Sequence, residues 1–240
     1  MEIIGIVTRL TPFKEKDAMV NIITEEKNLS FLARGVLGIA SKNMASVQPY
    51  TKSRFLLTRG KEGLSLRTGT VLETFQGAKE KLASLSTLSF IGELTNKVIS
   101  SEEARKIYPY LDKVLFLLDE GFDALTLALL YTGEILRAAG LGLEVTKCVI
   151  SGQRSDITAI SYLDGGFVAT PCFDALRHQK CSKRKLEIIR QIFLAKPEDL
   201  NRVVFEKWEC LEIIKELLIY LLDASGTRIK SVVLLEKGTQ

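Results

Sequence analysis

The side chains of this sequence most able to carry out metal or nucleophilic chemistry are four cysteines and a single histidine. Any Ser–His–acid or Cys–His site would have to use that histidine, and the residues around it supply no third group to orient the ring. We therefore expect the histidine to be a solvated surface side chain rather than a catalytic base. The five residues are Cys148, Cys172, Cys181, Cys210 and His178.

The cysteine spacing is close to that of a structural zinc site but lacks half of its ligands. Zinc takes four Cys or His ligands, often as two C-x2-C pairs. Ser151 stands where the partner of Cys148 is expected, and Ala169 stands where the partner of Cys172 is expected. We favour buried free thiols that pack as small apolar groups, with no bound metal or other cofactor. One alternative ligand set combines Cys148, Cys172, His178 and Cys181.

The motifs that mark common enzyme sites are missing from the sequence. It contains no GxxxxGKS or GxxxxGKT phosphate loop, and Gly140-Leu141-Gly142 follows a predicted helix rather than a strand. Acidic pairs such as Glu25-Glu26 are adjacent, so on a regular element their carboxylates face apart. We therefore expect a protein that is not an enzyme.

Positive charge is concentrated in the first third of the chain. The formal net charge is +4, and residues 1–80 hold all of this excess, with 12 Lys and Arg against 8 Asp and Glu. Cations neutralise nucleic-acid phosphates, and aromatic rings among them can stack on bases. The alternatives are an ordinary solvated surface for the cations and a core position for Phe31 and Phe55. The candidate cations are Arg9, Lys14, Lys16, Arg34, Lys42, Lys52, Arg54, Arg59, Lys61 and Arg67, and the aromatics among them are Phe13, Phe31, Tyr50 and Phe55.

A second cationic cluster spans residues 177–185, which carry five Lys or Arg and no acid. It extends the candidate nucleic-acid track, with Lys183 and Arg184 as its contacts, or provides a dock for an acidic partner segment. The alternative interpretation is a solvated loop and helix start.

The elements that must position these residues change character near Gly77. Five short strands are expected in residues 1–75, with a break at Thr11-Pro12 and a loop over residues 36–47. Five strands in so short a stretch predict a small closed barrel of the OB-fold type. The expected strands cover residues 3–7, 19–24, 29–35, 50–58 and 64–75.

Beyond Gly77 the apolar period changes from two to 3.6, which predicts helices. Ser101 and Asp123 are candidate N-caps, Gly140 is a candidate helix end, and Pro109 lies awkwardly inside the second helix. The expected helices cover residues 79–98, 102–118, 124–139, 186–194 and 203–222.

The helical region is interrupted by a different segment at about residues 145–183. Two short strands, 157–163 and 167–169, flank a turn at Asp164-Gly165-Gly166, and the segment resembles a zinc ribbon in outline. The predicted fold is therefore α+β, with a barrel domain over residues 1–77 and a helical domain with this insertion over residues 78–240.

No membrane span or export signal is evident. The N-terminus lacks a basic region followed by a long apolar run, and the most apolar C-terminal stretch, Leu217–Leu222, is far below the ~18–20 residues of a span. The cysteines show no paired framework, as in a reducing compartment. We expect a cytoplasmic protein with no membrane partner.

The ordered set of short motifs resembles the bacterial RecO family of recombination mediators, and the resemblance spans nearly the whole chain. No single motif is specific, but their order and spacing are. The matching stretches are Gly5-Ile6-Val7-x-Arg9, Thr11–Asp17, Thr24–Lys27, Phe31–Gly35, Gln48–Thr51, Leu136-Arg137-x-x-Gly140, Cys148-x3-Gly152 and Gly165-Gly166-Phe167.

The resemblance implies an N-terminal OB-fold, a C-terminal helical domain and no enzyme active site. It implies binding of single- and double-stranded DNA, annealing of complementary strands, and help for RecA in loading onto strands coated by the single-stranded-DNA-binding protein. Its implied partners are RecR and the acidic tail of the single-stranded-DNA-binding protein. The family often carries C-x2-C twice, and this chain keeps only Cys148 and Cys172, which puts zinc in doubt. The alternative is a non-enzymatic adapter whose helical domain carries the function.

Overall fold

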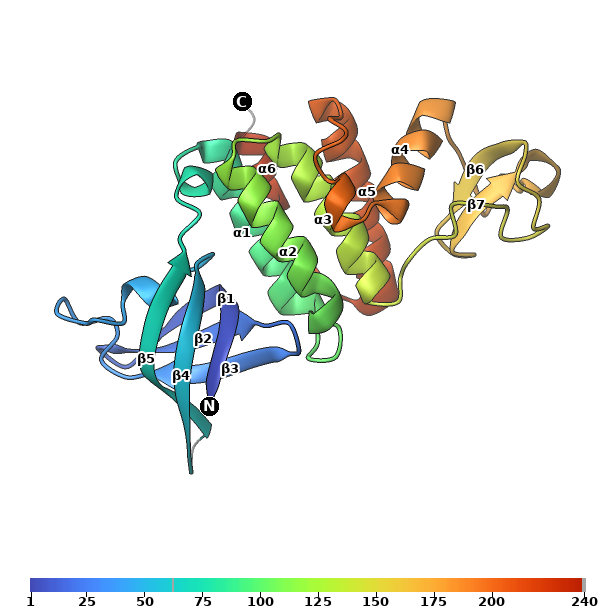
Figure 1. Ribbon diagram of the computed structural model, residues 1–240. Helices are drawn as coiled ribbons and strands as arrows, with labels where there is room; N and C mark the ends of the chain where they lie inside the picture. The colour runs from blue at the N-terminus through green and yellow to red at the C-terminus, as the bar shows by residue number, and fades with distance from the viewer. Residues whose placement is uncertain (62, 239–240) are drawn as a thin grey trace.

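The computed structural model describes residues 1–61 and 63–238 and shows a β-barrel joined to a helical part that ends in a small sheet (Figure 1). The barrel comes first in the chain, and the small sheet lies at the far end of the helices. The α+β architecture predicted from the sequence is confirmed.

Five strands close the barrel in the order β1-β2-β3-β5-β4. All neighbours are antiparallel except β3 and β5, which pair in parallel through Leu32 and Ser65. This is the five-stranded Greek-key barrel of the OB-fold. The strands are β1 (Glu2–Phe13), β2 (Asp17–Ile23), β3 (Asn28–Ala33), β4 (Lys52–Gly60) and β5 (Gly63–Glu73).

The barrel has its own apolar core, built by the alternation of side chains along its strands. Phe31 and Phe55 are both buried in it, with ring centroids 5.1 Å apart. The core interpretation of these two rings is therefore confirmed, and neither can stack on a base.

The expected break at Thr11-Pro12 is wrong, because β1 continues to Phe13. Beyond Ile6 the strand has β2 as its neighbour but no longer pairs with β4, and a bulge lies between Val7 and Arg9. Proline has no N–H to donate, and such an unpaired strand edge tolerates its absence.

The helices follow the predicted order with shifted ends. Asp123 caps its helix as expected, with Oδ1 accepting from the Thr126 N–H at 2.7 Å, and Gly140 follows the helix end with φ +79°. The helices are α1 (Leu82–Val98), α2 (Ala104–Asp119), α3 (Ala124–Ala138), α4 (Lys183–Leu194), α5 (Lys207–Ser225) and α6 (Val232–Gly238).

Three helix details differ from expectation. Ser101 does not cap α2, because its hydroxyl donates to the Asn28 carbonyl across the junction with the barrel. α5 begins four residues later than expected, where Glu206 and Glu209 form a capping box. α6 was not predicted, since its seven residues are too short for a clear helical period.

The insertion is a three-stranded sheet in the order β7-β6-β8. The strands β6 (Ile157–Ser161) and β7 (Gly166–Ala169) form the expected hairpin, and β8 (Gln179–Lys180) adds a third strand that the sequence did not reveal. Gly166 must be a glycine, because a Cβ atom there would collide with the backbone of Glu144.

The barrel and the helices share part of one core. Ile6 and Ile23 come from barrel strands but pack in the apolar core of the helical part. The Asn96 side chain of α1 hydrogen-bonds the Thr8 carbonyl at 3.1 Å. The two parts are thus joined by apolar contact as well as by polar bonds.

No helix in the described parts of the chain is long and apolar enough to cross a membrane.

Candidate nucleic-acid interface

The outer face of β2 and β3 is partly exposed and carries polar and apolar side chains, and α1 lies beside its end at Asn21 and Ser30. Met19 and Asn21 of β2 alternate with buried residues, as do Ser30 and Leu32 of β3. In OB-folds this face, with the β1–β2 and β4–β5 loops beside it, is the usual site for oligonucleotides.

The β1–β2 loop carries cations and one exposed ring at one border of this face. Phe13 is 45% exposed, and the Lys14 ammonium lies 5.3 Å from its ring centroid. Asp17 Oδ1 accepts from the Gly35 N–H at 2.7 Å, and this internal hydrogen bond partly neutralises the carboxylate. That bond holds Arg34, at the end of β3, next to the loop.

The loop over residues 34–47 carries the cationic surface around to β5. The Leu37 N–H donates to the Lys16 carbonyl at 2.9 Å. Further along, Asn43 Oδ1 accepts from the Gly69 N–H at 3.0 Å, and Asn43 Nδ2 donates to the Arg67 carbonyl at 3.4 Å. The residue after Lys42 is thereby held against the backbone of β5 at Arg67 and Gly69.

We call these exposed cations, together with those at the β4–β5 turn, the distal rim, because all of them except Arg67, which lies within β5, are at loops and strand ends away from the helices. β5 runs beside β3 at Leu32, so the β4–β5 turn borders the same face as the β1–β2 loop. The distal rim consists of Lys14, Lys16, Arg34, Lys42, Arg59, Lys61 and Arg67.

Three other predicted cations lie outside the distal rim. The Lys52 ammonium is 2.9 Å from both carboxylate oxygens of Asp112 on α2, so it joins the barrel to the helices. Arg54 lies 3.4 Å from Glu2 on the outer face of β4 and β1. Arg9 is exposed on β1, opposite Asn21.

The second cationic cluster is largely paired in three dimensions. Arg184 makes two bonds to Glu209, of 2.8 and 3.0 Å, and Lys185 contacts Glu212 at 2.9 Å and Glu216 at 2.5 Å. The three acids are spaced by three and four residues, so they share one face of α5. The sequence showed that spacing, but it did not show that α4 packs beside this face of α5.

Two cations of this cluster remain more open. The Lys183 side chain is 93% exposed and 4.0 Å from Glu187. Lys180 lies over the Phe173 ring at 5.1 Å from its centroid. The cluster therefore presents far less free charge than its sequence indicates.

His178 is buried, so the expectation of a solvated ring is wrong. Its Nδ1 accepts from the Asp174 N–H at 2.9 Å, which leaves the proton on Nε2 to donate to Asp164 Oδ2 at 3.1 Å. Asp164 also pairs with Arg177 at 2.7 Å, and Ser161 donates to it at 2.8 Å. These bonds lower the pKa of Asp164, with the Ser161 bond the largest cause.

Cys148 is also buried, and its sulfur is used by the backbone. Sγ accepts from the N–H groups of Ser151 at 3.5 Å and Ala169 at 3.3 Å. Burial opposes ionisation, but a hydrogen bond from the Ser151 side chain, together with the backbone N–H bonds, outweighs it and lowers the pKa of Cys148 to about 6.

These residues do not fit a zinc ion. Ser151 and Ala169 offer the Cys148 sulfur only hydrogen-bond donors where a zinc site needs two further ligands. The alternative set fails as well, because both ring nitrogens of His178 are bonded within the protein. No group of three or more Cys, His, Asp or Glu in the described ranges could hold a metal ion.

The barrel and its surface define a class of protein: an OB-fold protein whose exposed cations border the β2–β3 face, followed by a helical part. Residues 1–75 match the family model described as Recombination protein O N terminal. Residues 79–232 match the model described as Recombination protein O C terminal. The chain belongs to the RecO family of DNA repair and recombination proteins.

Curated relatives agree with this placement. A DNA repair protein RecO of Listeria monocytogenes serotype 4a (strain HCC23) is 26% identical over 233 residues, which cover 95% of this chain and 90% of the relative. A DNA repair protein RecO of Bacillus cereus (strain AH187) is 31% identical over 171 residues, covering 69% of this chain and 68% of the relative. The family confirms the expectation of a non-enzymatic protein of DNA repair.

Proposed function

We propose that this protein is a recombination mediator that binds single- and double-stranded DNA through the distal rim and anneals complementary strands. The observation that carries the proposal is the position of the rim, whose cations border the β2–β3 face of an OB-fold. Phe13 adds an exposed ring for stacking at the same border.

Annealing follows from charge neutralisation. Two strands repel each other through their phosphates, and a surface of cations lowers that repulsion. Phosphate contacts carry no sequence information, so the strands keep their base edges free to pair. The rim is exposed and mostly on loops, as such non-specific contact requires.

The proposal is tested by replacing two rim cations, Lys42 and Arg67, by glutamine in the full chain. Affinity for a labelled 30-nucleotide single strand is measured by fluorescence anisotropy between 50 and 200 mM salt. Each lost phosphate contact reduces the slope of log K against log salt by about 0.7, so the double variant loses about 1.4. We expect weaker binding to every sequence tested.

The matched control is the double variant K180Q/K183Q, which removes the same charge from the second cluster. We expect its affinity and salt slope to stay close to those of the unchanged protein. If K180Q/K183Q loses DNA affinity while K42Q/R67Q does not, DNA binds the helical part and the distal rim is not the binding site. Salt-insensitive or absent DNA binding by the unchanged protein favours the adapter alternative.

We propose the remaining family partners as well: RecR, RecA through strand loading, and the acidic tail of the single-stranded-DNA-binding protein, all at the nucleoid in the cytoplasm. Family membership supports them. For the acidic tail, Trp208 is 65% exposed and shares a hollow with Ile188 and with Arg184, the partner of Glu209. Unchanged binding of an acidic peptide to W208A would contradict this position.

A further inference from the structure

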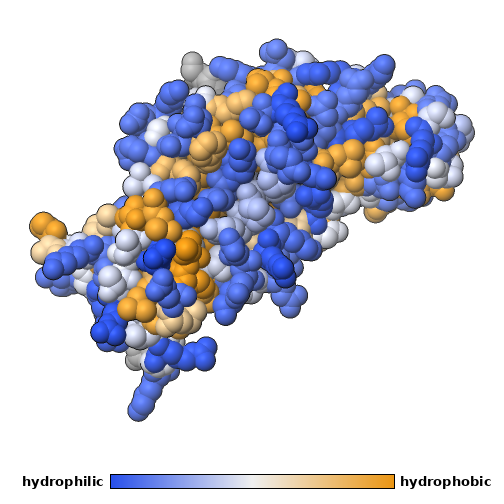
Figure 2. Space-filling model, in the orientation of Figure 1, coloured by the Kyte–Doolittle hydropathy of each residue, from blue (hydrophilic) through white to orange (hydrophobic). Residues whose placement is uncertain are grey.

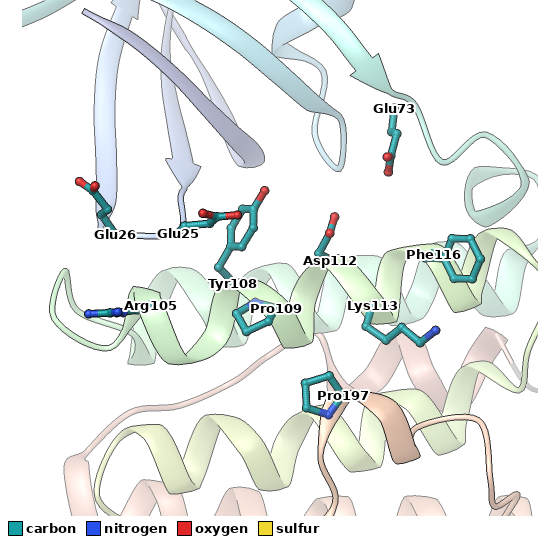
Figure 3. A pocket seen from close by; sticks show the side chains of 10 residues that line it. All are labelled: Glu25, Glu26, Glu73, Arg105, Tyr108, Pro109, Asp112, Lys113, Phe116 and Pro197. Atoms are coloured by element: carbon teal, nitrogen blue, oxygen red, sulfur yellow. The ribbon is translucent and has the colours of Figure 1, made fainter.

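A groove between the barrel and α2 lies apart from the distal rim. It has a volume of about 1070 Å³ and is bordered by the β2–β3 turn, the end of β5 and one face of α2 (Figure 3). A second hollow of about 690 Å³ shares four of its lining residues and extends it along the barrel past Ile4 and Leu72. The two together form one continuous surface.

The groove is lined by carboxylates from both sides. Glu25 and Glu73 reach it from the barrel and Asp112 from α2, and Glu26 lies at the turn beside Glu25 (Figure 3). Only Asp112 has a cation, Lys52, in an ion pair. Glu25, Glu26 and Glu73 have no ion pair with any Lys or Arg in the described parts of the chain.

Carboxylates from both sides of the groove affect the ionisation of Tyr108, which lies between them. Burial raises the pKa of the Tyr108 hydroxyl, Lys52 lowers it, and the charges of Asp112, Glu25 and Glu73 raise it further. Residues far apart in the sequence therefore place negative charge around a single hydroxyl.

α2 carries a proline in the wall of the groove. Pro109 has no N–H, so the Arg105 carbonyl one turn earlier has no α-helical partner. The Arg105 and Lys113 side chains run along α2 rather than toward the barrel (Figure 3), and Lys113 lies 4.9 Å from the Phe116 ring centroid. These two cations do not neutralise the acids facing them.

Apolar side chains accompany the acids. Phe116, Leu72 and Ile4 are each at least 40% exposed and line the groove or its extension. Apolar side chains gather on this side of the barrel, where it meets the helices (Figure 2). The surface thus offers hydrogen-bond acceptors, negative charge and apolar contact together.

We propose that this groove docks a basic segment of a partner protein. Lys or Arg side chains of that segment pair with Glu25 and Glu73, and an apolar side chain between them packs on Phe116. Nucleic acid fits the groove less well, because its phosphates would meet three unpaired carboxylates, and the cations Lys27 and Lys52 line only the extension. The groove is a second binding surface beyond the proposed DNA-binding role of the rim, at the opposite end of the barrel strands.

The test uses the full chain and a fluorescein-labelled 15-residue peptide of five Lys-Lys-Leu repeats. The same peptide with Glu in place of Lys is the control probe. We expect salt-sensitive binding of the Lys peptide only, with at least fivefold weaker binding to E25Q/E73Q. The matched control, E80Q/D223N, removes two exposed carboxylates elsewhere and should stay within twofold of the unchanged protein.

Equal loss in both double variants would show a general charge effect and overturn the proposal, as would no loss in E25Q/E73Q. F116A separates the apolar contact, since it should lower peptide affinity without changing the salt slope. Single-strand DNA affinity is measured on E25Q/E73Q as well. It should be unchanged, so that a failure of the groove and a failure of the rim are distinguishable.

Discussion

At the scale of single residues, the aromatic side chains of the barrel divide into two kinds that the sequence could not separate. Phe31 belongs to a buried ring pair, whereas Phe13 is exposed at the tip of a strand beside Lys14. Strand alternation favoured a core position for Phe31, but the exposure of Phe13 depends on β1 extending past Pro12. The pattern predicted the core and missed the extension.

Truncating the two rings should have opposite effects on stability and on DNA binding. Phe31→Ala leaves a cavity in the barrel core and should lower the free energy of unfolding by about 3–5 kcal/mol. Phe13→Ala should change that free energy by less than about 0.5 kcal/mol, because it is a surface position. It should instead weaken single-strand binding by about 1–3 kcal/mol through lost stacking.

Urea unfolding followed by circular dichroism measures the stabilities, and anisotropy measures the DNA affinity. Each variant serves as the control for the other. If Phe13→Ala unfolded as readily as Phe31→Ala, the Phe13 ring would have a structural role. If Phe13→Ala kept full DNA affinity, the Phe13 ring would not be part of the DNA-binding surface.

At the scale of elements, ion pairs between neighbours decide which charges remain free. Lys52 and Arg184 both counted as DNA contacts in the sequence, yet each is held by an acid more than 20 positions away. Local sequence shows the charge of a segment but not the helix that packs against it. His178 shows the same limit, since its burial depends on the Asp164 turn.

One carboxylate that the sequence did not single out binds the backbone just before α6. Glu93 on α1 accepts from the N–H groups of Lys230 at 3.0 Å and Ser231 at 2.7 Å, and lies 2.6 Å from the Lys97 ammonium. Burial opposes ionisation, but these bonds outweigh it and lower the pKa of Glu93 from 4.5 to about 2. The ionised form is therefore the one that binds this backbone.

Replacing Glu93 by glutamine should lower the free energy of unfolding by roughly 1–2 kcal/mol at pH 7. A depressed pKa contributes stability above the unfolded value of 4.5 and loses it as pH falls toward about 2. The difference between the variant and the unchanged protein should therefore shrink below pH 4.5. Urea midpoints at pH 7, 4 and 3 check this.

The exposed acid Glu80, replaced in the same way, is the control and should show no such pH-dependent difference. A Glu93→Gln difference that stayed constant from pH 7 to pH 3 would assign the loss to shape rather than to charge.

At the scale of the whole molecule, the two ends of the barrel carry clusters of opposite charge. Its distal end carries the rim cations, and the end that meets the helices carries Glu25 and Glu73. The sequence revealed the net positive charge of residues 1–80, but not that the seven rim cations gather at one end while Glu25, Glu26 and Glu73 lie at the other. That separation arises only when five strands run back and forth and bring every second loop to the same end.

The core shared between barrel and helices predicts that the two parts unfold together. Ile23 is a barrel residue that is fully buried in the core of the helical part. Ile23→Ala should cost about 2–4 kcal/mol of unfolding free energy through the cavity it leaves. Because that cavity adjoins the helices, hydrogen exchange should quicken in α3 as well as in β2, with one unfolding transition in urea.

Exchange is followed by mass spectrometry on peptides covering residues 17–23 and 124–138. Val204→Ala, at an exposed position of the helical part, is the control and should leave both peptides unchanged. Faster exchange confined to β2 would mean that the barrel opens by itself, and the Lys52–Asp112 and Asn96–Thr8 bonds would then be contacts between separately stable domains. Coupled exchange would instead tie the rim and the groove to one cooperative unit, so that a ligand at either end stabilises both.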